Sequence, residues 1–255
     1  MEQRAYSDKN IKVIDPLHAP EFYDRHFNRH ESWITIPDLS KNFRHYDLIS
    51  RTDDPKSGFQ GSVFLDKNTG HAVVLFKGMD IPLKDEGHGR LGFLRDIFTA
   101  AQSFLGKRTN SQSAAAEKIY LDTLQNPDVK SVETIGFSLG TLHVNHVAAK
   151  YGAVGTVLSD LGSSDRSLEK IFNQESGADA DENSLLKKLR ENVTVLDMGM
   201  DLLTKFFSAG PSRGTTIRLD EGPFPDLSGL FHRANTYARK AKRVSASTAT
   251  ALTMG

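Results

Sequence analysis

The pentapeptide Gly136-Phe137-Ser138-Leu139-Gly140 is the feature that most restricts how this chain can fold. A run rich in β-branched residues, 132–135, leads into it, and the segment 141–150 that follows is suited to a helix. A strand that turns directly into a helix leaves little room beside the turn, so the residues flanking the serine must be small. The two glycines meet this requirement because neither carries a Cβ atom.

The motif has the form G-x-S-x-G, and its strand–turn–helix setting is that of the nucleophile elbow in α/β-hydrolases. Such a turn raises the serine hydroxyl above the end of the sheet, while the following helix directs its N-terminal amides at the reacting centre. We therefore predict that Ser138 is a nucleophile. The simpler alternative is an ordinary Gly-Ser turn, because the pentapeptide alone also arises by chance.

The candidate base follows from chain order. Hydrolases of this kind place the serine first, then the acid, then the histidine. Of the 9 histidines, all but His232 precede Ser138 or lie in the helical run directly behind it. His232 is therefore the predicted base, and a surface histidine near the start of a helix is the alternative.

Two carboxylates compete for the role of the acid. Residues 192–196 are typical of a strand, which ends at Asp197, and Asp201 follows shortly after. A triad acid lies in the loop after a late strand, so either aspartate could serve. The other one would cap the apolar segment that follows, a position that aspartate favours.

A second oxyanion donor is expected upstream of the elbow. An apolar strand over 71–76 follows a hairpin turn at Asn68-Thr69-Gly70 and leads into Lys77-Gly78-Met79. A strand-end loop in this place supplies an oxyanion amide in α/β-hydrolases. The backbone N–H groups of Leu139 and Met79 would then stabilise the tetrahedral oxyanion together.

Taken together, these segments resemble the class 3 lipases and the related bacterial phospholipases A. The similar segments are 58–64, the turn 66–70, 73–80, the elbow and Asp201-Leu202-Leu203, within roughly residues 58–235. The resemblance implies hydrolysis of the carboxylic esters of lipids, by a lipase or a phospholipase A. It also implies roles for five residues: Ser138 as nucleophile, Met79 and Leu139 as oxyanion amides, Asp201 as acid and His232 as base.

Four positions depart from the pattern of that family. Lys77 stands in place of an arginine, Met79 of a hydroxyl residue, Phe137 of a histidine and Thr141 of a second glycine. Backbone amides survive such changes, although the loss of one oxyanion donor can cost about 2.7–4 kcal/mol. Two alternatives therefore remain: a weakened hydrolase-fold binding or effector module, and an acyltransferase or thioesterase that uses the same triad.

Composition limits the partners of the chain. Equal numbers of basic and acidic residues give a formal net charge of zero, so no electrostatic footprint for nucleic acid is present. No cysteine occurs, and neither the pair His143 and His146 nor the pair His26 and His30 has a third metal ligand nearby in sequence. We expect no cofactor and no metal. The resemblance to lipases implies a lipid or phospholipid substrate and transient contact with a membrane surface, and the sequence does not identify any protein partner.

The apolar segments of the sequence bear on where in or outside the cell the protein is expected. The first residues contain no apolar signal-peptide core, and no apolar run approaches the length of a membrane span. We expect no Sec signal peptide and no transmembrane helix. The protein would then be cytoplasmic, or exported by a signal-peptide-independent route as a secreted effector.

The pattern of the whole chain predicts an α/β-hydrolase fold, a mostly parallel sheet with helices on both faces. We expect an N-terminal irregular or helical layer over 1–57, a catalytic region over 58–243, and a disordered tail over 244–255. The apolar segments 91–105 and 198–207 either face the core or meet lipid. The expected strands are 61–66, 71–76, 131–135, 154–159, 192–197 and 215–219, and the expected helices lie near 91–105, 111–125, 140–150, 200–208 and 230–242.

Overall fold

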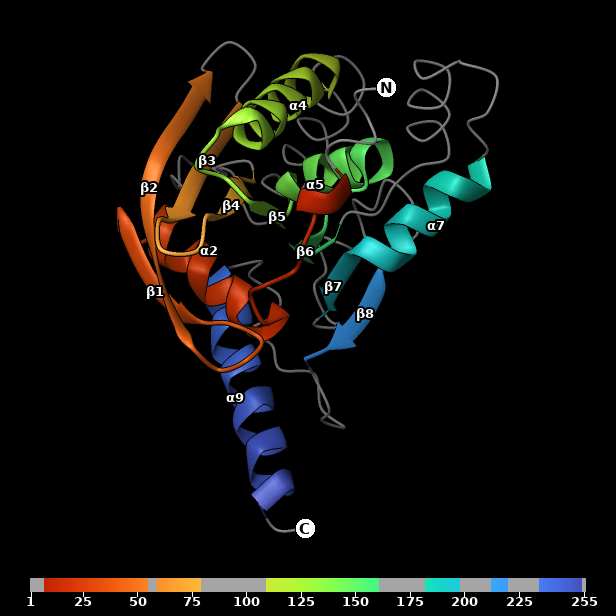
Figure 1. Ribbon diagram of the computed structural model, residues 1–255. Coiled ribbons are helices and arrows are strands. Elements are labelled where there is room, and N and C mark those ends of the chain that lie inside the picture. Colours follow the sequence, from red (N-terminus) through yellow and green to blue (C-terminus); the bar gives the residue numbers. More distant parts are fainter. Residues whose placement is uncertain are drawn as a thin grey trace, which may run out of the picture.

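A computed structural model describes residues 7–54, 59–78, 109–160, 182–197, 212–219 and 234–253, which form one eight-stranded sheet and the helices around it (Figure 1). The strands are β1 (Trp33–Pro37), β2 (Phe43–Asp54), β3 (Phe59–Asp66), β4 (His71–Phe76), β5 (Ser131–Phe137), β6 (Gly155–Leu158), β7 (Val193–Asp197) and β8 (Thr215–Arg218). The helices are η1 (Ser7–Lys9), η2 (Pro16–His18), α2 (Ala19–Phe27), α4 (Thr109–Gln125), α5 (Gly140–Tyr151), α7 (Glu182–Asn192) and α9 (Ala234–Thr253).

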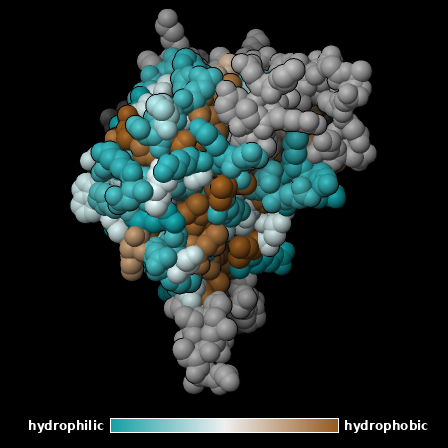
Figure 2. Space-filling view, in the orientation of Figure 1, coloured by the Kyte–Doolittle hydropathy of each residue, from teal (hydrophilic) through white to brown (hydrophobic). Residues whose placement is uncertain are grey.

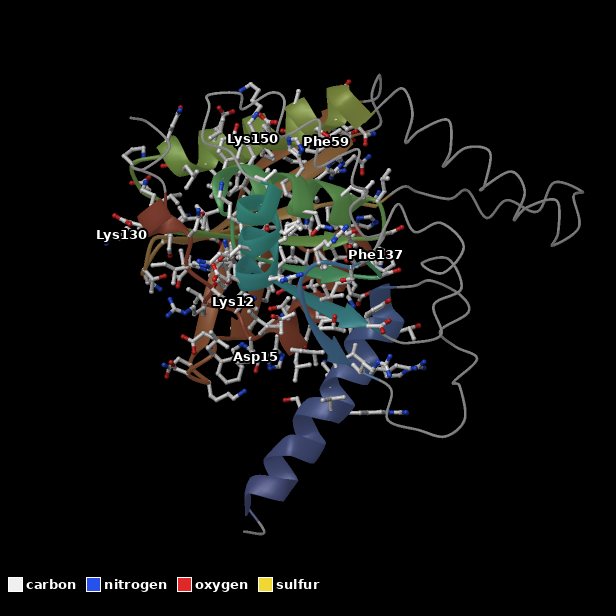
Figure 3. The ribbon with its side chains drawn as sticks, turned by 90° about the vertical axis from the view of Figure 1, so that its right-hand side faces the viewer. Lys12, Asp15, Phe59, Lys130, Phe137 and Lys150 are labelled. Carbon is white, nitrogen blue, oxygen red and sulfur yellow. The ribbon has the colours of Figure 1, made fainter. Side chains whose placement is uncertain are left out.

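The strands lie side by side in chain order. β1 to β4 pair antiparallel, whereas β4 to β8 pair parallel, so the sheet is mixed and mostly parallel. Parallel strands end at the same edge of a sheet. The residues that follow β4, β5, β6 and β7 are therefore brought to one edge, and Figure 3 shows β5 running toward that edge from Lys130 to Phe137.

The centre of the sheet is buried on both faces. Every residue of β4 is buried, and its side chains alternate: Ala72, Val74 and Phe76 join one core, while Val73 and Leu75 join the other. Helices α4, α5 and α7 cover the first core, and α2 and α9 cover the second. This double cover explains why β4 is apolar from Ala72 to Phe76 instead of alternating with polar residues.

The expected α/β class is confirmed, and the six expected strands all occur, each within two residues of its predicted bounds. The expected helices over 111–125 and 140–150 correspond to α4 and α5, and the one near 230–242 corresponds to α9. The expected helices near 91–105 and 200–208 lie outside the described residues.

The N-terminal layer differs from the expectation. The sequence predicts an irregular or helical layer over 1–57, but β1 and β2 fall within it and extend the sheet. In β1 the buried Ile34 and Ile36 alternate with more exposed neighbours, which is the period-two pattern of a strand. The first part of this region does form short helices, of which α2 covers the second core.

The C-terminal tail also differs from the expectation. Residues 244–253, predicted to be disordered, continue α9, which extends away from the sheet in Figure 1. Alanine recurs in this stretch, and neither proline nor glycine occurs before Gly255, so nothing in the sequence ends the helix earlier. In the described part of the chain, no helix is both long and apolar enough to cross a membrane.

Figure 2 shows one face of the molecule. Most of the described residues on this face are hydrophilic, and hydrophobic residues gather in a band down its middle. On the edge strand β1 the ring of Trp33 is 54% exposed, yet the Arg25 guanidinium lies 5.8 Å from it and the His45 ring 5.7 Å. These contacts reduce the apolar area that the edge strand presents to other chains.

A buried polar network ties the N-terminal segment to the sheet. The Glu133 carboxylate of β5 accepts hydrogen bonds from the backbone N–H groups of Val13 at 2.6 Å and Ile14 at 3.1 Å. Burial raises the pKa of Glu133 to about 7. The hydroxyl of Tyr46 and Nδ1 of His71 lie within hydrogen-bond distance, 2.9 Å, and His71 Nε2 is 3.7 Å from the Glu133 carboxylate. His71 and Glu133 lie in the first halves of β4 and β5, away from the edge of the sheet that carries Ser138.

Another buried histidine, His143, belongs to the first turn of α5. The His143 ring packs edge-on against Phe59 at 5.4 Å and Phe76 at 5.8 Å between ring centroids. Its Nδ1 atom is buried without a hydrogen-bond partner among the described residues. Burial lowers the pKa of His143 from 6.5 to about 3, so the folded protein keeps this ring neutral.

We predict that this burial makes the fold sensitive to acid. Below pH 6.5 the unfolded chain takes up a proton at His143 that the folded chain does not, so the free energy of unfolding falls as the pH falls. At pH 5 the loss from this one group is about 2 kcal/mol. Urea denaturation at pH 7.5 and pH 5 should therefore show a smaller loss for His143→Leu, which has similar volume and does not titrate. The exposed-site control His30→Asn should lose as much as the wild type, and an unchanged loss in His143→Leu would contradict the prediction.

Candidate active site

Ser138 occupies the sharp turn between β5 and α5. Its φ of +54° lies in the left-handed region, which residues with a Cβ atom seldom adopt. Hydrogen bonds hold the turn on both sides: Ser138 N donates to Leu158 O at 3.0 Å, and Ser138 O accepts from the Thr141 N–H at 3.0 Å and the Thr141 hydroxyl at 2.6 Å. Backbone strain that the surroundings maintain in this way concentrates at functional sites.

The two glycines of the motif are required by close backbone packing. A Cβ atom on Gly136 would lie 2.5 Å from the carbonyl oxygen of Gly140. A Cβ atom on Gly140 would collide with the carbonyl oxygen of Phe76, at the end of β4. The prediction that both flanking residues must lack a Cβ is therefore confirmed, and the second glycine also brings β4 against the start of α5.

A third glycine joins the end of β4 to the elbow. A Cβ atom on Gly78 would lie 2.7 Å from the Phe137 carbonyl oxygen and 3.0 Å from the Cβ atom of Ser138. The Gly78 N–H donates to the Tyr23 hydroxyl at 3.0 Å, and the preceding Lys77 N–H donates to Gln60 O, also at 3.0 Å. The chain thus leaves β4 directly beside the serine, which is the position expected for an oxyanion loop.

The groups that would react are open to a ligand. Ser138 and Leu139 are both partly exposed, and Leu139 is the N-cap residue of α5. Within the described residues, neither the Ser138 hydroxyl nor the Leu139 N–H has a hydrogen-bond acceptor. The N-terminal end of a helix attracts negative charge through its free N–H groups and its dipole. An oxyanion beside Ser138 would therefore be stabilised by Leu139.

Three of the predicted site residues lie outside the described residues: Met79, Asp201 and His232. Chain neighbours of two of them lie at the elbow. Gly78, which precedes Met79, packs against Ser138, and the ring of Tyr237, five residues after His232, lies 6.0 Å from that of Phe137. Of the predicted site residues, the structure therefore describes Ser138 and its chain neighbour Leu139. It also places α9, the helix that follows His232 in the chain, against Phe137.

Asp197, the alternative acid, ends β7 and lies at the same edge of the sheet as Ser138. Its Oδ2 atom is 3.9 Å from Nε of Arg218 on β8, and its backbone carbonyl accepts from the Leu219 N–H at 2.9 Å. Both side chains of this ion pair are largely solvent-accessible, 36% and 77% exposed, so the pair contributes little to stability. These contacts link β7 to the strand beside it.

A further carboxylate at this edge escapes the sequence analysis. Asp160 follows β6, and its Oδ1 atom accepts a hydrogen bond from Asn145 Nδ2 of α5 at 3.1 Å. The preceding Ser159 has a φ of +58°, a second left-handed turn beside the first. Asp160 lies two residues after Leu158, the residue that binds the Ser138 N–H. The sequence signal that could have pointed to Asp160 is its position just after the strand that follows the elbow helix.

Among the described residues, no three His, Cys, Asp or Glu side chains lie close enough together to hold a metal ion. Neither comparison with protein-family models nor comparison with curated proteins finds a match for the chain. The chemistry of this edge is therefore inferred from its geometry. A partly exposed serine at a strained turn, with a helix N-terminus and a glycine-bearing strand end beside it, is suited to attack on a carbonyl carbon.

We predict that Gly140→Ala destabilises the protein far more than Gly152→Ala. The first change forces a Cβ atom into the Phe76 carbonyl, an overpacking that costs about 3 kcal/mol or more. The second meets only Asn192 at 3.7 Å, and the φ of +69° at Gly152 costs about 1–2 kcal/mol. Urea denaturation of the two variants measures the difference. Equal losses would show that β4 and α5 are not in such close contact.

Proposed function

We propose that the chain is a serine hydrolase with an α/β-hydrolase fold that cleaves carboxylic esters of lipids through an acyl-enzyme. The observation that carries the proposal is the turn at Ser138, with its φ of +54° between a strand and a helix. Three glycines allow the surrounding backbone to approach this serine. Such a turn supports the nucleophile elbow better than an ordinary Gly-Ser turn, which needs neither the strain nor the close packing.

The proposed reaction has two steps. His232 takes the proton of the Ser138 hydroxyl as its oxygen bonds to the ester carbonyl carbon, and the N–H groups of Leu139 and Met79 stabilise the oxyanion. The bond from that carbon to the alcohol oxygen then breaks, and the alcohol leaves with the proton from His232. Water, activated by the same histidine, releases the acid from Ser138. Asp201 would orient the imidazole and stabilise its charged form.

The assignment of His232 is supported by the position of α9. This helix begins two residues after His232, and its Tyr237 packs on Phe137 beside the nucleophile. The helix that follows His232 in the chain therefore packs against the residue before Ser138, and His232 also has the place of the base in the chain order of the triad. The assignment of Asp201 depends on the family resemblance, because two other aspartates, Asp197 and Asp160, also lie at or just after the ends of strands at this edge.

Lipids are proposed as substrates because of the resemblance to class 3 lipases and bacterial phospholipases A. The two apolar segments 91–105 and 198–207 come after β4 and β7 in the sequence, and these two strands end at the edge of the sheet that carries Ser138. With a net charge of zero, contact with a membrane surface would depend on insertion of apolar side chains more than on attraction to anionic lipid.

We predict that Ser138→Ala abolishes hydrolysis of both a dispersed phospholipid and a soluble p-nitrophenyl ester. The wild type should hydrolyse the aggregated lipid faster than the soluble ester at equal concentrations of ester bonds. The control Ser113→Ala, within α4, should retain the wild-type rates. Hydrolysis that persists in Ser138→Ala would overturn the mechanism, and a preference for the soluble ester would replace the lipase with a general esterase.

We predict that Asp201→Asn lowers kcat by about 10³–10⁴-fold, because the charged form of His232 loses its partner. Asp197→Asn and Asp160→Asn should keep kcat within about tenfold of the wild type. Steady-state kinetics on the soluble ester, with melting temperatures alongside, compare the three variants. If the inactive variant is that of Asp197 or Asp160 and it is well folded, that residue is the acid and the assignment of Asp201 is wrong.

A further inference from the structure

Helix α2 contributes a buried tyrosine to the edge that carries Ser138. Tyr23 is only 3% exposed, and its hydroxyl accepts a hydrogen bond from the Gly78 N–H at 3.0 Å. Gly78 lies two residues beyond the end of β4, where the ladder of strand hydrogen bonds has stopped. The side chain from α2 therefore replaces a strand as the partner of this N–H.

The same helix also contacts the other side of the elbow. The ring of Tyr23 lies 5.4 Å from that of Phe137, the residue before the nucleophile, and 4.7 Å from that of Phe27. Phe27 in turn lies 5.7 Å below Nζ of Lys77. One tyrosine thus touches both strands that end at the proposed oxyanion hole, and its neighbour on α2 touches the residue that precedes Gly78.

Gly78 is the described residue that directly precedes Met79 in the chain. Its position is restricted from two directions, by the hydrogen bond to Tyr23 and by the contact of its Cα region with Phe137 and Ser138. The next N–H along the chain belongs to Met79, the proposed second oxyanion donor. A donor of this kind is effective only when it is held in place before the charge develops.

We propose that Tyr23 is a positioning residue of the oxyanion hole: its hydroxyl and ring hold Gly78, the residue before the proposed donor Met79, beside Phe137 and Ser138. The inference rests on the proposed function. Tyr23 acts through Gly78 and does not contact the reacting atoms. It gives α2 a role in catalysis in addition to its role in covering the sheet.

The variant Tyr23→Phe tests the inference because it keeps the ring contacts and removes the hydroxyl that accepts from Gly78. We expect kcat on a soluble ester to fall about 10–100-fold, less than the 10²–10³-fold that follows removal of an oxyanion donor. KM should remain within about twofold. A trifluoromethyl ketone that forms a tetrahedral adduct with the serine should lose affinity in proportion to kcat, because its oxyanion needs the same donors.

Tyr46→Phe is the matched control. It also removes a buried hydroxyl, the one beside His71 Nδ1, but on the polar network that ties the N-terminal segment to the sheet. This variant should lower the melting temperature and leave kcat and the inhibitor affinity unchanged. If Tyr23→Phe behaves like Tyr46→Phe while the wild type is active, the role of Tyr23 is structural and the inference is wrong. A folded wild type without esterase activity overturns the proposed function instead, and the inference with it.

Discussion

The arrangement of the candidate site depends on close backbone contact among the end of β4, the end of β5 and the start of α5. Gly136, Gly140 and Gly78 make this contact, since a Cβ atom on any of them would meet a backbone oxygen within 2.7 Å. Such contact leaves the chain at Ser138 no relaxed alternative, and its backbone is accordingly held in the left-handed region. The strain at the serine is thus a consequence of packing in the surrounding sheet.

The N-terminal segment acts on this sheet at both ends. At one end the Glu133 carboxylate accepts hydrogen bonds from the backbone N–H groups of residues 13 and 14, and its burial raises its pKa. At the other end Tyr23 of α2 reaches Gly78 and Phe137. The segment before β1 is therefore part of the same folding unit as the elbow, and it is not a separate layer laid over a finished sheet.

The sequence reveals what is local. The strand before Ser138, the helix after it and the need for flanking glycines are all encoded within residues 132–150, and they were predictable. β2 was not predicted because it is largely polar, with only Tyr46 fully buried, so its hydrophobic period is weak; β1 was not predicted either, although it does carry the period-two pattern. The roles of Tyr23 and Asp160 could not be predicted either. Tyr23 meets Gly78 across 55 positions of sequence, and Asp160 reaches the elbow through the pairing of β5 with β6 and the hydrogen bond from Asn145 of α5.

The central claim is that Ser138 is an activated nucleophile, and covalent labelling tests it most directly. The folded wild type would be treated with a fluorophosphonate, digested and analysed by peptide mass spectrometry, with Ser138→Ala treated in parallel. The account predicts one phosphonylated residue, Ser138, and no labelling of the variant. A folded wild type that remains unlabelled, or that is labelled at a different residue, would contradict it.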